Sequence, residues 1–202
     1  MTTWSGRVLK LDFRPSRDGM PFANFWPKGA AIRVQKRSVG RVYGGLCGGM
    51  CQLSKELWLS GEPIPENASP TDSGFVDRLV SAQVESLGLP GGPLRYLGLQ
   101  LPPRTTARRK STAQTLASVR ADLAAGRPSC VGLLRALSWS PGMLNKHHVV
   151  LAYAMREDPD ETTLTVYDPN HPGNDRVRII VKADSTIQTN QSDPQTLALL
   201  AF

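Results

Sequence analysis

The chain has 202 residues, of which 40% are hydrophobic and 20% charged, and its formal net charge at pH 7 is +7. These proportions are typical of a globular domain and exclude a disordered or low-complexity chain. No apolar run approaches the roughly 18 residues of a membrane span, and the first residues contain no apolar secretory signal. We therefore expect no membrane association, and a location in the cytoplasm or export by a secretion system that needs no signal peptide.

The first 42 residues are expected to form an irregular, strand-poor lead-in, because prolines interrupt them repeatedly. A helix is predicted to begin near Cys47, where apolar residues recur at helical spacing, and to end at Gly61. Further helices are predicted over about 73–87 and 112–125. A glycine- and proline-rich break over 88–93 separates those two helices.

After residue 128 the pattern changes to short apolar or alternating segments, which are typical of strands. Strands are predicted over 129–136, 148–155, 162–168 and 176–182, with a polar hairpin turn at 157–161. Helices followed by an antiparallel sheet indicate an α+β fold. We predict a single domain over 1–202, with a helical lobe at about 43–127 and a sheet lobe at about 128–202.

Two cysteines lie close together in a glycine-rich segment, and both are candidate nucleophiles. Cys47 is predicted at the start of a helix, where unpaired backbone N–H groups lower the pKa of a thiol. The glycines on both sides permit close approach of a substrate carbonyl, and the Cys47 amide is a candidate oxyanion donor. Cys51 lies one helical turn later and is the alternative, with a more natural place in the core. Cys130, in an apolar run, is expected to be a buried small hydrophobe.

A histidine and an aspartate in the predicted sheet are suited to act with that thiol. His148 opens an apolar strand and is a candidate base and acid, and its neighbour His147 is the alternative, because adjacent strand residues face opposite sides. Asp168 ends the next strand, so hairpin pairing places it beside His148, where it would fix the imidazole tautomer. Asn170 is the alternative third member. The Cys-His-Asp set indicates an enzyme, a hydrolase with a thiol nucleophile.

These segments also resemble a known family. The His-Val-Val-Leu-Ala-Tyr sequence at 148–153 resembles the histidine strand of papain-like cysteine peptidases. Cys-Gly at 47–48 and Tyr-Asp-Pro at 167–169 are similar to the corresponding elements of the bacteriocin-processing branch, in which an aspartate is the third member. The resemblance covers about 43–170. It implies a two-lobed fold with the cysteine helix packed on a small antiparallel sheet, and peptide-bond hydrolysis in a cleft between the lobes.

The sequence departs from this family at one functional position. The resemblance implies a glutamine about six residues before the cysteine, as an oxyanion donor, and Arg41 stands there. Gln35 is too early by spacing, unless a loop brings it in. The second oxyanion donor is therefore unassigned by the sequence.

The function predicted from these residues is cleavage of a protein substrate by Cys47, His148 and Asp168. By resemblance, small domains of this kind include bacterial processing peptidases and toxins delivered between cells, and we expect the second context. The same residues can also deamidate glutamine or transfer acyl groups, since only the acceptor of the thioester differs. A non-catalytic binding domain is the third alternative. No cofactor is expected, and the cysteine and histidine spacing does not favour a metal site.

The basic charge is concentrated in two segments, at 33–41 and at 104–110. Such clusters favour nucleic acid or an acidic protein partner, or are simply solvated loops. Aromatic residues are not interleaved with the charge and no nucleic-acid-binding motif accompanies it, so we do not expect nucleic acid. In the toxin context, we expect an acidic neutralising protein as a partner.

Overall fold

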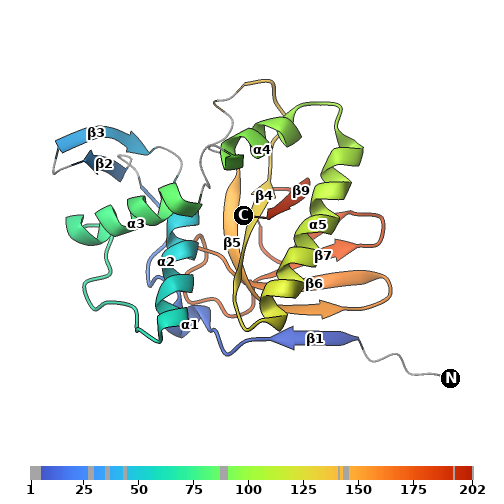
Figure 1. The fold of residues 1–202 in the computed structure, drawn as a ribbon, viewed down its shortest axis with the longest axis horizontal. Coiled ribbons are helices and arrows are strands. Elements are labelled where there is room, and N and C mark those ends of the chain that lie inside the picture. The colour runs from blue at the N-terminus through green and yellow to red at the C-terminus, as the bar shows by residue number, and fades with distance from the viewer. Residues whose placement is uncertain are drawn as a thin grey trace.

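The structure is a computed structural model, and it describes residues 6–26, 30–34, 37–42, 45–86, 91–140, 142, 146–192 and 194–201. A seven-stranded antiparallel sheet occupies one half of the molecule (Figure 1). Its main path runs β8–β7–β6–β5–β4–β9, and β1 pairs with the far end of β5. The strands are β1 (Arg7–Lys10), β4 (Ser129–Leu134), β5 (His148–Glu157), β6 (Glu161–Tyr167), β7 (Arg178–Lys182), β8 (Ile187–Thr189) and β9 (Ala198–Ala201).

The other half contains helices and a separate two-stranded sheet (Figure 1). Its elements are α1 (Pro15–Asp18), β2 (Ala30–Val34), β3 (Arg37–Val42), α2 (Cys47–Ser60) and α3 (Ser73–Ser86). Two more helices, α4 (Gly91–Gln100) and α5 (Thr105–Ala124), lie on the side of the large sheet. Helices and an antiparallel sheet confirm the predicted α+β class.

Strand β5 lies between two helices, and its side chains alternate between them. Val149, Leu151 and Tyr153 belong to the buried cluster that includes the core face of α2. Val150 and Ala152 belong to a second cluster, beneath α5. Successive strand residues point to opposite faces, so a strand covered on both sides is apolar throughout. This explains the unbroken apolar run that predicted a strand here.

Glycines at the start of α2 allow α3 to approach closely. A Cβ atom on Gly49 would lie 2.2 Å from the backbone oxygen of Leu79, a separation that real Cβ atoms do not show. The Gly49 N–H also donates to Oε1 of Gln83, at 2.8 Å. The first turn of α2 is therefore fixed against α3, while the next turn contacts β5 through Cys51, whose Sγ lies 3.5 Å from the backbone oxygen of Val149.

The structure corrects several expectations about the elements. The lead-in was expected to be strand-poor, but it contains β1, β2 and β3. The α4 helix begins inside the predicted break, and α5 begins at Thr105 instead of residue 112. Helices α1 and α4 and two short strands, β8 and β9, were not predicted. The other helices and strands lie where the sequence placed them, and β5 and β6 form the predicted hairpin.

The predicted helical lobe of 43–127 is divided between the two halves. Val119 and Leu123 of α5 are buried with strand residues of the large sheet, while the core residues of α2 and α3 form the first cluster. The two-helix unit that faces β5 is thus α2 with α3, and α5 covers the opposite face of the sheet (Figure 1). Within the described residues, no helix combines the length and the hydropathy needed to cross a membrane.

Candidate active site

Cys47 is the first residue of α2, as the glycine pattern predicted. The residue before it, Leu46, is the N-cap and provides no side-chain cap, although its carbonyl accepts the first helical hydrogen bond, from Met50. The Cys47 side chain is only 8% exposed. A thiol at this position lies next to the unpaired N–H groups and the positive end of the helix dipole, both of which favour a thiolate.

His148 and Asp168 meet because β5 and β6 are paired strands. Tyr167 pairs with Leu151, so the residue that follows β6 lies near the beginning of β5. The His148 Nε2 atom lies 2.7 Å from Oδ1 of Asp168, and both side chains are less than 5% exposed. The Asn170 backbone N–H donates to the same Oδ1 atom, at 2.8 Å. The carboxylate is therefore fixed on one side by the histidine and on the other by its own loop.

The Cys47 thiol and the His148 ring also face each other, closely enough for each group to shift the pKa of the other. Because Asp168 occupies Nε2, the nitrogen left for the sulfur is Nδ1. The backbone N–H groups of Gly48 and Val149 also lower the pKa of this thiol. The structure thus brings the three predicted residues into one chain of contacts, in the order Cys47, His148, Asp168.

These contacts set the charges of the three groups. Burial raises the pKa of Cys47, but the positive charge and hydrogen bond of His148 outweigh burial and lower it below its usual value. Burial lowers the pKa of His148, but the facing Cys47 and Asp168 together raise it to about 9. Burial raises the pKa of Asp168, and the bond to His148 more than reverses that effect. Near neutral pH the arrangement therefore favours thiolate, imidazolium and carboxylate.

The other two cysteines have the opposite electrostatics. Burial raises the pKa of Cys51 well above its usual value, and the neighbouring thiols and Asp168 raise it further. Burial likewise raises the pKa of Cys130 to about 11. Both are protonated core thiols at neutral pH, and a protonated thiol is a poor nucleophile. Of the three, only Cys47 contacts a histidine.

His147 lies in a separate buried group. Its Nε2 atom is 3.0 Å from Oε1 of Gln100, and its Nδ1 atom accepts the Arg135 N–H at 3.3 Å. Its ring stacks on Tyr96, with the centroids 4.9 Å apart, and burial lowers the pKa of His147 to about 4. The Tyr96 hydroxyl donates to the backbone oxygen of His148. A neutral His147 therefore supports the start of β5 and is turned away from Cys47.

Asn24 is the residue of this site that the sequence did not indicate. Its Oδ1 atom accepts the backbone N–H of Leu46 at 2.7 Å and the indole N–H of Trp26 at 3.2 Å. Its backbone N–H donates to the carbonyl of Pro169, at 2.8 Å. Asn24 thus connects the residue before Cys47 with the loop after Asp168. No sequence signal marks it, because it lies 23 positions before the cysteine in the segment expected to be irregular.

The structure does not show the side chain of Arg41, which stands where the resemblance implies a glutamine, or of Gln35, the alternative donor. Arg41 belongs to β3, and its side chain lies outside the described part of the chain, as does all of Gln35. Asn170, the alternative to Asp168, contacts Asp168 through its backbone N–H and not through its side chain. Among the described residues, no group of three or more His, Cys, Asp and Glu side chains is arranged to hold a metal ion.

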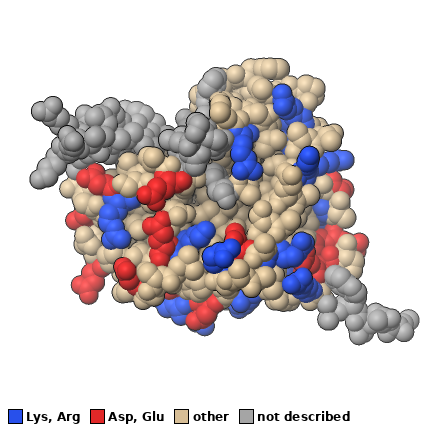
Figure 2. Space-filling model, viewed as in Figure 1, with Lys and Arg blue, Asp and Glu red and all other residues tan. Residues whose placement is uncertain are grey.

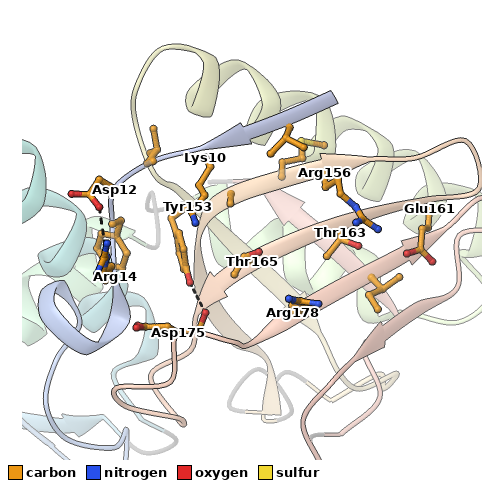
Figure 3. A pocket seen from close by; sticks show the side chains of 16 residues that line it. Lys10, Asp12, Arg14, Tyr153, Arg156, Glu161, Thr163, Thr165, Asp175 and Arg178 are labelled. Atoms are coloured by element: carbon orange, nitrogen blue, oxygen red, sulfur yellow. Dashed lines mark hydrogen bonds and ion pairs between the residues drawn. The ribbon is translucent and has the colours of Figure 1, made fainter. Parts of the chain in front are cut away.

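A hollow of about 540 Å³ lies elsewhere on the large sheet, between β1, β5, β6 and β7 (Figure 3). Its floor includes Tyr153, Thr163, Thr165 and Arg178, and none of the three site residues lines it. Its charges are mixed: Arg14 lies 3.6 Å from Asp12, and Arg156 lies 2.7 Å from Asp158. The residues that line this hollow include no cysteine and no histidine, so it is separate from the candidate active site.

No protein-family model, no curated protein and no solved structure matches this chain. An assignment of function therefore depends on the geometry of the described residues. In that geometry a thiol, an imidazole and a carboxylate are in contact at the start of a helix and at the adjoining ends of two paired strands.

Proposed function

We propose that this chain is a cysteine peptidase that cleaves a protein substrate. One observation carries the proposal: a buried Cys47 thiol with a lowered pKa faces His148, whose ring contacts the Asp168 carboxylate. A thiolate is the nucleophilic form of cysteine, and an adjacent oriented base is the usual arrangement for covalent catalysis. No metal or cofactor is required for this chemistry.

The proposed reaction has two halves. The Cys47 thiolate attacks the carbonyl carbon of the scissile peptide, and the carbonyl electrons move to oxygen to form a tetrahedral oxyanion. When this species collapses, the C–N bond breaks, His148 gives its proton to the leaving amine, and an acyl thioester remains on Cys47. His148 then accepts a proton from water, the hydroxide attacks the thioester, and the acid product and the thiolate are released.

The arrangement of elements supports a papain-like form of this enzyme. The cysteine opens a helix, α2, which packs on β5, the strand that carries the histidine, and the aspartate follows the paired strand β6. The chain order Cys, His, Asp is also that of the bacteriocin-processing branch, which the sequence resembles. We propose, on this basis, that the active site opens between the α2–α3 half and the large sheet.

The experiment that tests the function is a search for new protein termini. The purified chain is added to a bacterial lysate, and N-termini are mapped by mass spectrometry in parallel with the Cys47→Ala variant. We expect new N-termini with the unchanged chain and none with the variant. If the unchanged chain instead converts glutamine to glutamate without new termini, the enzyme is a deamidase. If both proteins act alike, the chain is a binding domain.

We further propose an acidic protein as a partner, in keeping with a toxin that must be neutralised. Residues 86–121 contain six basic and no acidic residues: Arg95, Arg104, Arg108, Arg109, Lys110 and Arg120. Figure 2 shows Lys and Arg side chains over α4 and α5 on this face. A groove there is bordered by Arg95, Arg104 and Lys110, and it has no acidic residue in its lining. Such a surface attracts an acidic protein.

A charge-reversal pair tests this surface with polyglutamate as the probe. At about 0.1 M salt, Arg104→Glu with Lys110→Glu should weaken binding roughly 10-fold, because two favourable charges become repulsive. The matched control is Arg7→Glu with Lys10→Glu, two exposed residues of β1, which makes the same change in net charge. Equal weakening by the two pairs would show that only net charge matters.

A further inference from the structure

The tetrahedral intermediate proposed above requires donors for its oxyanion, and the structure offers one on the backbone. In the first turn of α2, the Gly49 N–H is bound to Gln83 and the Gly48 N–H faces the Cys47 sulfur. The Leu46 N–H is bound to Asn24. The Cys47 N–H donates to no other described residue. Because this group belongs to the nucleophilic residue itself, it lies close to a substrate oxygen bonded to the carbon that Cys47 attacks.

We propose that the side-chain amide of Asn24 is the second donor, and that Nδ2 of Asn24 and the backbone N–H of Cys47 together bind the oxyanion. The proposal rests on the thiol hydrolase function proposed above. It assigns to this chain's own Asn24 the role that the family resemblance gives to a glutamine at the position where this sequence has Arg41.

The orientation of the Asn24 amide is fixed by its partners. Two donors, the Leu46 N–H and the Trp26 indole N–H, both point at the same atom. That atom must be the carbonyl oxygen, because an NH2 group there would face two other N–H groups. The Nδ2 group is therefore on the opposite side, and it is presented as a donor.

The place of the amide is fixed by Gly45, two residues before Cys47. Gly45 has φ +101°, and a Cβ on it would lie 2.5 Å from Nδ2 and 2.6 Å from Oδ1 of Asn24. A glycine is needed here both for its backbone conformation and for the close approach of the amide. The backbone N–H of Asn24 donates to Pro169, so the residue is held from the Asp168 side as well. The amide thus lies against the segment that leads into Cys47.

The Nδ2 group has a hydrogen to give. It donates to Oδ1 of Asn170 at 3.4 Å, which is a long contact that uses one of its two hydrogens. Asn24 is half-buried, so the group is shielded but not sealed from the surface. A donor that is already oriented before the substrate arrives stabilises developing charge without reorganisation, which is the condition for a large effect on rate.

The test compares two reactions of the same thiol. With p-nitrophenyl acetate, the Cys47 thiolate attacks the carbonyl carbon, the oxyanion forms and then collapses, and nitrophenolate leaves an acetyl thioester on sulfur. With iodoacetamide, the thiolate displaces iodide from carbon and no oxyanion forms. The ratio of the two rate constants, each taken at its pH plateau, therefore isolates stabilisation of the oxyanion from activation of the thiol.

The decisive variant is Asn24→Asp. A carboxylate still accepts the Leu46 and Trp26 N–H groups, so a merely structural role is preserved, but the Nδ2 donor becomes an acceptor. We expect the acylation-to-alkylation ratio to fall about 10²-fold, as is typical for loss of one oxyanion donor. The matched control is Gln83→Glu, which keeps its bond to the Gly49 N–H and places the same charge near the same helix start.

The outcomes are distinct. An unchanged ratio in Asn24→Asp, or an equal fall in Gln83→Glu, would overturn the assignment of Asn24. If Cys47 of the unchanged chain is not acylated and is alkylated no faster than a free thiol, the proposed hydrolase function itself fails, whatever the variants do. Asn24→Gln is the companion variant. If residue 24 acts through its amide N–H, the acylation-to-alkylation ratio in Asn24→Gln should lie between those of Asn24→Asp and the unchanged chain.

Discussion

Cys47 in the unchanged chain should react with iodoacetamide at pH 6 about 10²-fold faster than in the His148→Gln variant. An ordinary thiol has a pKa of about 8.5 and is almost wholly protonated at this pH. Here the imidazolium of His148 lowers the pKa of Cys47 against the opposing effect of burial. Without that charge, burial outweighs the remaining effect of the Gly48 and Val149 backbone N–H groups, and the thiolate is lost. The measurement is the rate of carbamidomethylation of the Cys47 peptide, followed by mass spectrometry from pH 4 to 10.

The pH dependence of turnover should differ from that of alkylation. Alkylation needs only the thiolate, so it rises through the lowered pKa of Cys47 and then stays constant. Turnover also needs the proton of His148, whose raised pKa is about 9, so it should fall again as pH rises through about 9. The apparent pKa values read from the two limbs of this profile describe the coupled Cys47–His148 pair and not either residue alone.

The control for the predicted loss of alkylation in His148→Gln is the His147→Gln variant. His147 has a pKa of about 4 and contacts Gln100 and Tyr96, so its loss removes no charge near the thiol. The folded His147 variant should therefore keep the alkylation profile of the unchanged chain. A His148 variant that reacts as fast as the unchanged chain, or a His147 variant that loses the reaction, would contradict the assignment of His148.

Replacing Asp168 with asparagine should lower turnover by about 10²- to 10⁴-fold. Substituting the aspartate of a catalytic triad has effects at the upper end of this range. Asparagine has the same shape, but it removes the charge that stabilises the imidazolium and helps to raise the pKa of His148. The descending limb of the turnover profile should move from about pH 9 to lower pH. The shift is checked by the pH profile and by NMR titration of the His148 ring.

Asn170→Ala is the companion to this variant, because Asn170 is the other residue that the sequence offers for the third role. Its side chain makes one long contact, with Asn24, and none with His148 in the described structure. We expect a far smaller loss of turnover than in Asp168→Asn. If Asn170→Ala instead lowers turnover more than Asp168→Asn, the third catalytic residue is Asn170 and the contact of His148 with Asp168 has only a structural role.

The candidate site was predicted mainly by residues whose local pattern reflects their role. The glycines around Cys47 and the apolar spacing after it indicate a helix start. The apolar run after His148 indicates a buried strand, and Asp168 ends the alternating segment that follows it. Hairpin neighbours are local in sequence, so their proximity is predictable. The choice of Cys47 over Cys51 followed in the same way, since only the first residue of a helix lies at its unpaired N–H groups.

The lobe boundary was less predictable, because a helix pattern does not state which surface the helix covers. The apolar residues of α5 fit a buried stripe equally well against α2 or against the sheet. In the structure they pack with Val131, Val150 and Leu164. The prolines of the lead-in similarly gave no sign that β1 pairs with the far end of β5, nearly 150 residues away. Such pairings depend on long-range contacts that no short window contains.

The sequence by itself determined the α+β class and the three residues proposed for catalysis. It did so because helix starts, buried strands and hairpins are encoded by neighbouring residues. Only the tertiary structure decided which side of the sheet each helix covers, that His147 faces away from Cys47, and that Asn24 reaches the Cys47 segment. Asn24 lies there because its carboxamide accepts the Leu46 N–H while its backbone binds Pro169. Those contacts join three segments that the fold brings together, and a linear pattern records none of them.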